Sequence, residues 1–221
     1  MKNNYSIIIP VFNEIKHIKR LILGLKPYHD KNHEIIVVND GSNDGSLELL
    51  RESNFIKLLS FNENKGKGIA IKKGLKAATN EKIIIFDSDM ELNPNQLELL
   101  MILNKDQNIK CVFANRYINK KQYKSFWDYG NYIITFIYNI INKSNIKDPL
   151  CCAKSFFITD ININKLSSSK FDIDIELTSK LLKCNDSYLN VNIHYRRRNK
   201  KQGKKLRLID SILILKRIWM G

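Results

Sequence analysis

Two aspartates one residue apart, Asp87 and Asp89, follow directly after the apolar run at 82–86. Such a run predicts a buried strand, so the two carboxylates lie at its carboxyl end. Ligands of α/β proteins bind at that end of the strands, and two carboxylates there can both reach one divalent cation. An Asp-x-Asp pair also arises as a strand end with solvated carboxylates. The segments around the pair therefore decide its meaning.

Two more apolar runs end in acidic or amide side chains. Residues 7–14 read Ile-Ile-Ile-Pro-Val-Phe-Asn-Glu, and residues 37–42 read Val-Val-Asn-Asp-Gly-Ser. Three such strand ends predict one site for a metal-bound diphosphate. Asp40 followed by glycine is also typical of a plain turn, and Glu14 of a helix start. Either local structure is compatible with a place in the site.

A glycine-containing segment, Asn-Lys-Gly-Lys-Gly at 64–68, precedes a predicted helix. Glycine lets a backbone approach a phosphate, and the amides at a helix start favour anions. The segment lacks the Gly-Lys-Ser/Thr ending of a P-loop. We expect Lys67 to lie near a bound nucleotide, with helix entry as the equal alternative.

The elements that must position these groups alternate between strand and helix. In the first half we predict strands at 5–9, 34–38, 55–60, 82–86 and 109–114, and helices at 14–25, 44–51, 66–78 and 94–103. Continuous apolar strands alternating with helices indicate an α/β fold with a mostly parallel central sheet and helices on both faces. In the second half we predict helices at 127–141, 173–182 and 206–219 and strands at 154–158 and 187–193.

Composition fits one globular domain, because 221 residues with 43% hydrophobic and 27% charged content can bury a full core. The four cysteines lack zinc-site spacing, and we expect them to be reduced, in a reducing compartment. We expect no signal peptide and no membrane span. The longest apolar stretch, 129–141, is too short and is interrupted by polar residues.

The net charge of +15 predicts an anionic partner: nucleic acid, nucleotide phosphates or an anionic membrane surface. A Lys-rich and Asn-rich composition explains part of the excess but not the block at 195–205, which has no acidic residue. That block is either an anion-contact segment or a solvated loop. Acidic strand ends would repel nucleic acid unless a metal is present, so we expect no nucleic acid partner. A catalytically silent nucleotide-sugar-binding protein is a further alternative.

In order and spacing, these motifs resemble the family 2 glycosyltransferases of the GT-A fold, and more narrowly the polyprenyl-phosphate (dolichyl-phosphate) mannose and glucose synthases. The further matching segments are 115–117, 148–156, 174–177 and the basic block. The resemblance implies an inverting transferase that uses a nucleotide-diphospho-sugar and Mg²⁺ or Mn²⁺. It implies a single domain over 1–221, with a donor half at 1–115 and an acceptor half at 116–221.

The implied acceptor is a polyprenyl phosphate at the cytoplasmic membrane face. The alternative is a hydroxyl of a surface polysaccharide or a lipid-linked glycan. We therefore expect a cytoplasmic, peripheral membrane protein, with a membrane-anchored partner protein as a further expectation. The helix at 206–219 fits either an anionic membrane surface or the core, and the helix at 127–141 favours the core.

The resemblance also assigns residues on the donor side. Asp87, Asp89 and Glu91 are the expected metal ligands, with Asp89 as the direct one, and Ser88 lies between them among the substrate-binding residues. The remaining donor-side residues contact the nucleotide. Asp40 is expected to accept hydrogen bonds from the base, and Pro10 and Glu14 to line the nucleoside pocket.

On the acceptor side, Arg116 matches an arginine that faces a donor or acceptor phosphate, with a surface arginine as the alternative. Arg198 matches a loop that closes over the diphosphate. Asp174 is the expected catalytic carboxylate, which would deprotonate a hydroxyl acceptor but is not needed as a base for an anionic phosphate. The spacing of Asp174 and Glu176 places only one of them toward the site if the segment is a helix. Glu176 is expected among the substrate-binding residues, and a solvated helix start is the alternative for both.

The chain departs from that family pattern in two places. Two extra residues separate Arg198 from the glycine at 203, and no serine precedes the following lysines. Cys152 and Ala153 stand where relatives carry Gly-Phe. Both departures lie on the acceptor side, which is therefore expected to differ from that of the synthases.

Overall fold

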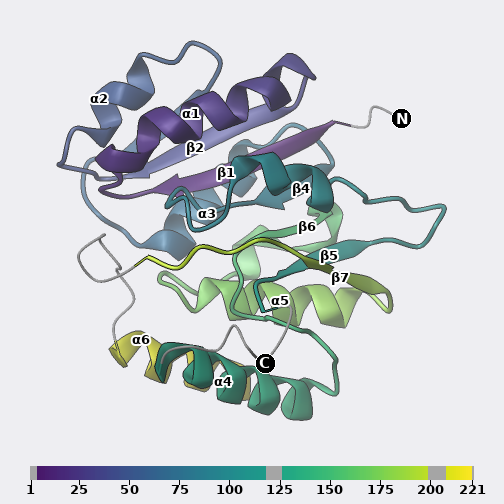
Figure 1. Cartoon of the computed structure of the whole chain (residues 1–221). Coiled ribbons are helices and arrows are strands. Elements are labelled where there is room, and N and C mark those ends of the chain that lie inside the picture. The colour runs from purple at the N-terminus through teal and green to yellow at the C-terminus, as the bar shows by residue number, and fades with distance from the viewer. Residues whose placement is uncertain (1–3, 118–125, 199–207, 221) are drawn as a thin grey trace.

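The computed structural model describes residues 4–117, 126–198 and 208–220. These residues contain a seven-stranded sheet in the order β3-β2-β1-β4-β6-β5-β7 (Figure 1). The strands are β1 (Tyr5–Val11), β2 (Glu34–Asp40), β3 (Lys57–Phe61), β4 (Lys82–Ile85), β5 (Cys111–Asn115), β6 (Lys154–Phe157) and β7 (Tyr188–Asn192). Only β6 runs antiparallel to its neighbours, β4 and β5. The expected mostly parallel sheet is confirmed.

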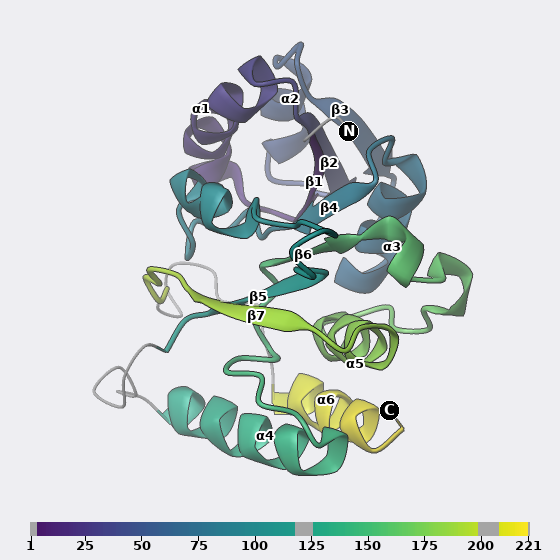
Figure 2. The same cartoon turned by 90° about the vertical axis from the view of Figure 1, so that its right-hand side faces the viewer.

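Helices cover both faces of this sheet. The α-helices are α1 (Ile15–Asp30), α2 (Ser46–Arg51), α3 (Lys67–Ala77), α4 (Phe126–Asn142), α5 (Ile173–Cys184) and α6 (Leu208–Met220). The 3₁₀ helices are η1 (Pro94–Leu100), η3 (Ile158–Asp160) and η4 (Ile163–Lys165). One hydrophobic cluster joins the sheet to α1, α2 and η1, and a second joins its other face to α3 and α5. Figure 2 shows α4 and α6 as a further layer beyond α5.

The burial of β1 explains why its sequence is a continuous apolar run. All seven of its residues are buried. Successive side chains point to opposite faces of a sheet, so Ile7 and Ile9 join the first cluster while Ile8 joins the second. A strand covered on both faces must be apolar at every position.

The strand order reverses between β1 and β4. The chain runs from β1 outward to β2 and β3, and it then returns through α3 to β4 on the other side of β1. Such a reversal leaves a crevice at the carboxyl ends of the two central strands, where α/β proteins bind ligands. The segments after β1, β2 and β4 are those that the sequence predicts to form the site.

One predicted helix has a different form. The segment expected as a helix over 94–103 is the 3₁₀ helix η1, which ends at Leu100. Its buried residues Leu97 and Leu100, and Leu103 beyond it, recur every three positions, which is the 3₁₀ repeat. Asn93 caps η1 by accepting a hydrogen bond from the Asn95 amide, as its place before Pro94 predicts.

The preference for a core position of the 127–141 helix is only partly right. Tyr138 of α4 is fully buried, but Phe136 and Ile140 are 59% and 62% exposed. The helix packs on α6 with one side and presents the other to solvent. No helix in the described part of the chain is long and apolar enough to cross a membrane. All four cysteines are free, as expected.

Candidate active site

A cavity of about 790 Å³ opens at the carboxyl ends of β1, β2 and β4. Eleven of the twelve predicted site residues line it: Pro10, Glu14, Asp40, Lys67, Asp87, Ser88, Asp89, Glu91, Arg116, Asp174 and Arg198. Glu176 is not among the lining residues. Residues far apart in the chain therefore meet in one place, and their contacts show what each side chain does in the folded protein.

Asp40 ties the glycine-containing loop to the end of β2. Its Oδ1 accepts a hydrogen bond from the Lys65 amide at 2.8 Å, and its Oδ2 accepts one from the Gly66 amide at 2.9 Å. Burial outweighs these bonds and raises the pKa of the Asp40 carboxyl. Each oxygen keeps a second lone pair for a further donor, such as a nucleotide base.

The glycines of this loop approach the chain's own backbone. A Cβ on Gly66, which has a φ of 99°, would lie 2.2 Å from the Ser169 carbonyl oxygen. The Gly68 amide donates a hydrogen bond to that same oxygen at 2.9 Å. The sequence predicts that a phosphate approaches the backbone of this loop closely. In the structure the segment before α5 makes that close approach. This contact links the first half of the chain to the second.

Lys67 bridges two carboxylates from different elements. Its Nζ lies 2.9 Å from Asp87 Oδ1 after β4 and 2.9 Å from Asp174 Oδ2 in α5. Burial by itself lowers the pKa of Lys67, but the charges of Asp174 and Asp87 raise that pKa well above its usual range. Burial likewise tends to raise the pKa of Asp87, and the charge of Lys67 holds it below its usual range.

Arg198 lies among the acidic groups on the other side of the cavity. Its Nη2 donates to Asp89 Oδ2 at 2.8 Å, and its Nη1 donates to both Glu14 oxygens at 3.0 and 3.1 Å. Its backbone amide donates to Glu91 Oε1 at 2.9 Å. The buried Nε of Arg198 has no hydrogen-bond partner in the described part of the chain. The guanidinium thus occupies the space between three carboxylates.

Among the cavity carboxyl groups, Asp89 is the one whose negative charge is least compensated by its surroundings. Burial and the charges of Asp87 and Glu91 raise its pKa to about 7, although Arg198 opposes the shift. A carboxyl held among like charges favours the arrival of a cation. Among the described residues no group of three or more His, Cys, Asp or Glu side chains is arranged to hold a metal. One or two carboxylates still suit Mg²⁺ or Mn²⁺, because substrate phosphates and water complete their coordination.

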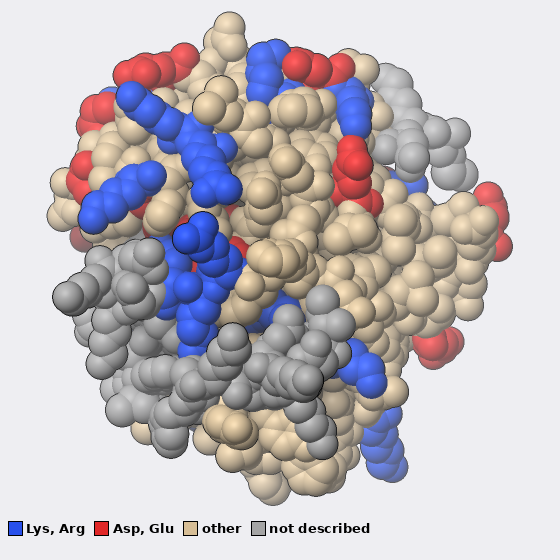
Figure 3. All heavy atoms as spheres, in the orientation of Figure 1, with Lys and Arg blue, Asp and Glu red and all other residues tan. Residues whose placement is uncertain are grey.

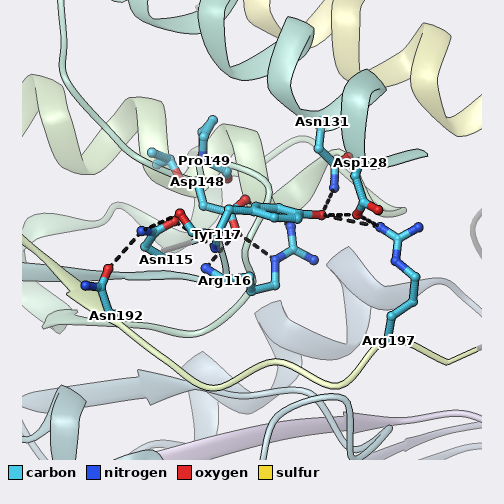
Figure 4. A network of polar contacts seen from close by, with 10 residues as sticks. Asn115, Arg116, Tyr117, Asp128, Asn131, Asp148, Pro149, Asn192 and Arg197 are labelled. Carbon is cyan, nitrogen blue, oxygen red and sulfur yellow. Dashed lines mark hydrogen bonds and ion pairs between the residues drawn. The ribbon is translucent and has the colours of Figure 1, made fainter. Parts of the chain in front are cut away.

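Arg116 is neutralised by a residue to which the sequence assigns no role. Its Nε and Nη2 donate to Asp148 at 2.7 and 2.9 Å, and Asp148 is 2% exposed (Figure 4). The guanidinium also lies 5.6 Å from the Tyr117 ring centre and 5.4 Å from that of Tyr195. In the sequence, what pointed to Asp148 was its place in the segment at 148–156, which matches the family pattern.

A second network holds the acceptor side together (Figure 4). The Tyr117 hydroxyl donates to Asp128 at 2.9 Å and accepts from Asn131 of α4 at 2.9 Å. Arg197 forms an ion pair with Asp128. These contacts connect the end of β5, the start of α4 and the segment after β7. The sequence assigned no role to any of these four residues, although Tyr117 lies in the matching segment at 115–117.

The segment with Asp174 and Glu176 begins α5, and both side chains are buried, so a solvated helix start is wrong. Glu176 accepts hydrogen bonds from the Ser167 and Ser168 amides and shapes the loop before α5. Asp174 faces the cavity, and its Oδ1 is buried with no hydrogen-bond partner among the described residues. The helical geometry separates the two carboxylates, as their spacing predicts.

Cys152, at one of the two departures from the family pattern, lies close to Asp87. Its thiol is buried, and that burial together with the charge of Asp87 raises its pKa well above the usual range. The thiol therefore stays protonated at neutral pH and acts as a hydrogen-bond donor toward Asp87.

Crystal structures of a glycosyl-transferring enzyme have a similar fold. Glucosyl-3-phosphoglycerate synthase from Mycobacterium tuberculosis, crystallised with Mn²⁺, UDP and phosphoglyceric acid, superimposes with a TM-score of 0.72. The alignment covers 98% of this chain and 78% of that one at 16% sequence identity. The same enzyme crystallised with phosphoglyceric acid alone gives a TM-score of 0.73. The fold is therefore the GT-A fold of glycosyltransferases.

The sequence comparisons agree with the fold. The profile described as Glycosyl transferase family 2 matches residues 6–165, and the chain belongs to that family. It is 38% identical over 119 residues to the uncharacterized glycosyltransferase YkcC of Bacillus subtilis, covering 51% of this chain and 36% of that protein. It is 26% identical over 195 residues to the undecaprenyl-phosphate 4-deoxy-4-formamido-L-arabinose transferase of Aeromonas hydrophila, covering 77% and 58%.

A third relative is the cholesterol galactosyltransferase of Borreliella burgdorferi, which is 34% identical over 143 residues, covering 61% of this chain and 39% of that protein. The chain thus spans between 36% and 58% of the length of these relatives. Family and fold together place the chain among the family 2 glycosyltransferases of the GT-A fold.

Proposed function

We propose that this glycosyltransferase takes its sugar from a nucleotide-diphospho-sugar, with Mg²⁺ or Mn²⁺ as cofactor, and transfers it with inversion to a polyprenyl phosphate at the cytoplasmic face of a membrane. The observation that carries the proposal is the convergence of three strand ends on one cavity, which brings Asp40, Asp87 and Asp89 together. The Aeromonas relative, which has undecaprenyl phosphate in its name, supports the acceptor. The Mn²⁺ and UDP in the mycobacterial enzyme support the donor.

Each donor-side residue has a chemical task in this proposal. Asp87 and Asp89 would hold the cation, which when bound offsets the negative charge of the leaving diphosphate. Asp40 would accept hydrogen bonds from the base with the lone pairs that the Lys65 and Gly66 amides leave open. Lys67 lies between Asp87 and Asp174, at the junction of the donor and acceptor sides.

Arg198 would exchange partners when the donor binds. In the ligand-free arrangement its guanidinium pairs with Asp89 and Glu14. A cation on Asp89 would repel that guanidinium, while a diphosphate nearby would attract it. Arginine suits such an exchange because its planar donors match phosphate oxygens as well as carboxylates. The Arg198 guanidinium would thereby leave the acidic side chains and contact the diphosphate, where it would offset the negative charge that develops on the leaving group.

A hydroxyl acceptor is a second candidate, favoured by the orphaned Oδ1 of Asp174. In that reaction the Asp174 carboxylate would take the proton of the acceptor hydroxyl. The hydroxyl oxygen would form a bond to the sugar carbon, and the bond from that carbon to the diphosphate would break, with its electron pair going to the diphosphate. The cholesterol galactosyltransferase relative has an acceptor of this kind in its name.

The donor site is tested by calorimetric binding of UDP- and GDP-sugars with and without Mn²⁺. We expect Mn²⁺-dependent binding to the wild type, its loss in Asp89→Ala, and its retention in Asp106→Ala, an exposed aspartate remote from the cavity. Binding that ignores both Mn²⁺ and the Asp89 substitution would contradict the proposed donor site.

The same preparations separate the two acceptor classes through Asp174→Asn. Transfer to a polyprenyl phosphate needs no base, so this variant should keep most of its activity on that acceptor. Transfer to a hydroxyl should fall by about 10² to 10⁴-fold, because positioned bases contribute that much. Activity of the wild type on neither acceptor class, with donor binding intact, would exclude both candidates.

A further inference from the structure

One side of α4 presents a stripe of large apolar side chains to solvent. Tyr129, Tyr132, Ile133, Phe136 and Ile140, which we call the α4 face, are between 47% and 62% exposed. Their positions differ by three, one, three and four, so they lie along one side of a helix. The opposite side is held in the protein, where the buried Tyr138 hydroxyl contacts Ser179 of α5 at 3.1 Å.

Charges are found at the ends of this stripe and not within it. No Lys, Arg, Asp or Glu occurs between Asp128 and Lys143. Lys143 and Lys147 are exposed after the end of α4, and Lys216 is exposed on the neighbouring α6. In Figure 3 residues drawn in grey cover much of the lower end of the molecule, where Figure 1 shows α4 and α6. The described surface below them is tan, with blue side chains at its lower right-hand edge. An apolar face with a basic margin is complementary to a surface of anionic lipid.

We propose that the α4 face binds the surface of an anionic lipid bilayer, with α4 lying in the plane of the headgroups. Aromatic side chains with one polar end settle at such an interface, and the face contains two tyrosines. Trp219 of α6, which is 79% exposed, adds a third residue of this type beside it. The three exposed lysines at its margin would contact lipid phosphates while their stems lie along the apolar surface.

A second copy of the chain fits this face less well. Five half-exposed side chains offer roughly 500 Å², whereas a standard protein interface takes about 800 Å² from each partner. Positive charge on both copies would also oppose pairing through this face, since the lysines at its margin would meet their counterparts. Binding to a bilayer requires no minimum protein interface and brings no like charges together.

The other side of the same helix forms a wall of the cavity. Gly130, Asn131 and Ile134 of α4 line it, together with Ser211 and Ile214 of α6. A Cβ placed on Gly130 would meet no atom within 4 Å, so the wall is open at this point. Docking through the α4 face would therefore bring the cavity next to the lipid. The part of the inference that concerns an acceptor entering from the bilayer rests on the proposed function, whereas the docking itself does not.

The test is co-sedimentation of the chain with vesicles of phosphatidylcholine alone or mixed with phosphatidylglycerol, without any sugar substrate. We expect the wild type to bind the mixed vesicles and not the neutral ones. The double variant Ile133→Glu/Phe136→Glu should bind the mixed vesicles at least about tenfold more weakly, because two large apolar groups are replaced by anions. Leu23→Glu is the matched control, because Leu23 is 74% exposed on α1.

Two results would overturn the docking proposal. One is vesicle binding by the double variant equal to that of the wild type. The other is a wild-type dimer that ignores vesicles and that the double variant dissociates, measured by light scattering after gel filtration. Mn²⁺-dependent nucleotide binding by the double variant checks that it is folded. If no variant binds a nucleotide sugar, circular dichroism makes that check, and the proposed function fails while the vesicle result still decides on the α4 face.

Discussion

At the scale of single residues, the cavity is built from ion pairs between groups that a ligand would separate. Lys67 pairs with Asp87 and Asp174, and Arg198 pairs with Glu14 and Asp89. Although the protein has a net charge of +15, these basic side chains of the cavity are paired with its own carboxylates. Although Asp89 is paired with Arg198, burial and the charge of Asp87 still disfavour its ionised form and raise its pKa.

Asp89 should make the ligand-free protein less stable as the pH rises. Its pKa is about 7 in the folded chain and about 3.9 when unfolded, so the folded state holds the proton more tightly. Stability is then lost from about pH 4 to about pH 7 and levels off above that. Asp89→Asn removes this loss. Its stability relative to the wild type should grow by about 2 to 3 kcal/mol between about pH 5 and pH 8.

Urea denaturation with EDTA at the two pH values measures this difference. Asp106→Asn, an exposed substitution outside the cavity, should show no comparable change. Addition of Mn²⁺ at the higher pH should stabilise the wild type and leave Asp89→Asn unchanged, because a ligand of the native state stabilises only where it binds. A pH-independent difference between variant and wild type would contradict the assignment.

The sequence predicts which residues gather in the cavity but not how they pair. The acidic strand ends were visible because each follows an apolar run. Their partners were not visible, because Lys67 and Asp174 are 107 positions apart and Arg198 and Glu14 are 184 apart. Asp148 was missed for the same reason: a buried arginine requires a partner, but spacing along the chain does not say which acid supplies it.

At the scale of elements, two helical glycines show opposite packing. Gly74 of α3 faces the sheet, and a Cβ there would lie 2.4 Å from Ile8 Cγ2 and 3.3 Å from Val38 Cγ2. Gly130 of α4 has open space around the corresponding position. The first lets α3 approach β1 and β2 closely, and through α3 it sets the position of Lys67 at the helix start.

Alanine substitution should therefore act in opposite directions at these two glycines. Gly74→Ala gains helix propensity but overpacks the core, and we expect a net loss of about 1 to 2 kcal/mol. Gly130→Ala should stabilise the protein by about 0.5 to 1 kcal/mol, because it meets nothing and restricts the unfolded chain. Chemical denaturation of both variants measures the two effects. If both substitutions change the free energy of unfolding in the same direction, the close approach of Gly74 to Ile8 does not govern the effect of the added methyl group.

The strands and most helices could be predicted from the sequence, because a continuous apolar run or a near-four-residue repeat of apolar side chains is a local property. The form of η1 depended on a finer distinction, a three-residue repeat of leucines at 97 and 100. The exposure of α4 could not be predicted, because periodicity shows which side of a helix is apolar but not what that side contacts. Phe136 and Tyr138 are both aromatic residues of α4, yet Phe136 is 59% exposed and Tyr138 is fully buried.

At the scale of the whole molecule, the segments before and after residue 115 share one sheet. β6 from the second half lies between β4 and β5 of the first, with hydrogen-bonded pairing on both sides. β7 extends the same sheet beside β5. Both hydrophobic clusters contain residues from before and after position 115. The boundary at residue 115 is therefore not a surface at which the chain could divide.

The two halves should consequently unfold together. Separating them would expose the edges of β4 and β5 and would open both clusters, so a state with one half folded has no compensating gain. Hydrogen exchange followed by mass spectrometry at increasing urea tests this. Peptides covering β1 and β2 should show the same opening free energy, and the same dependence on urea, as peptides covering β6 and α5. Peptides covering the short 3₁₀ helix η4, in which Asn164 and Lys165 are exposed, serve as the control and should exchange early at every urea concentration. Protection of β1 that outlasts that of α5 would mean that the first half is stable alone, and the interleaved β6 would then be a late addition to an independent nucleotide-binding unit.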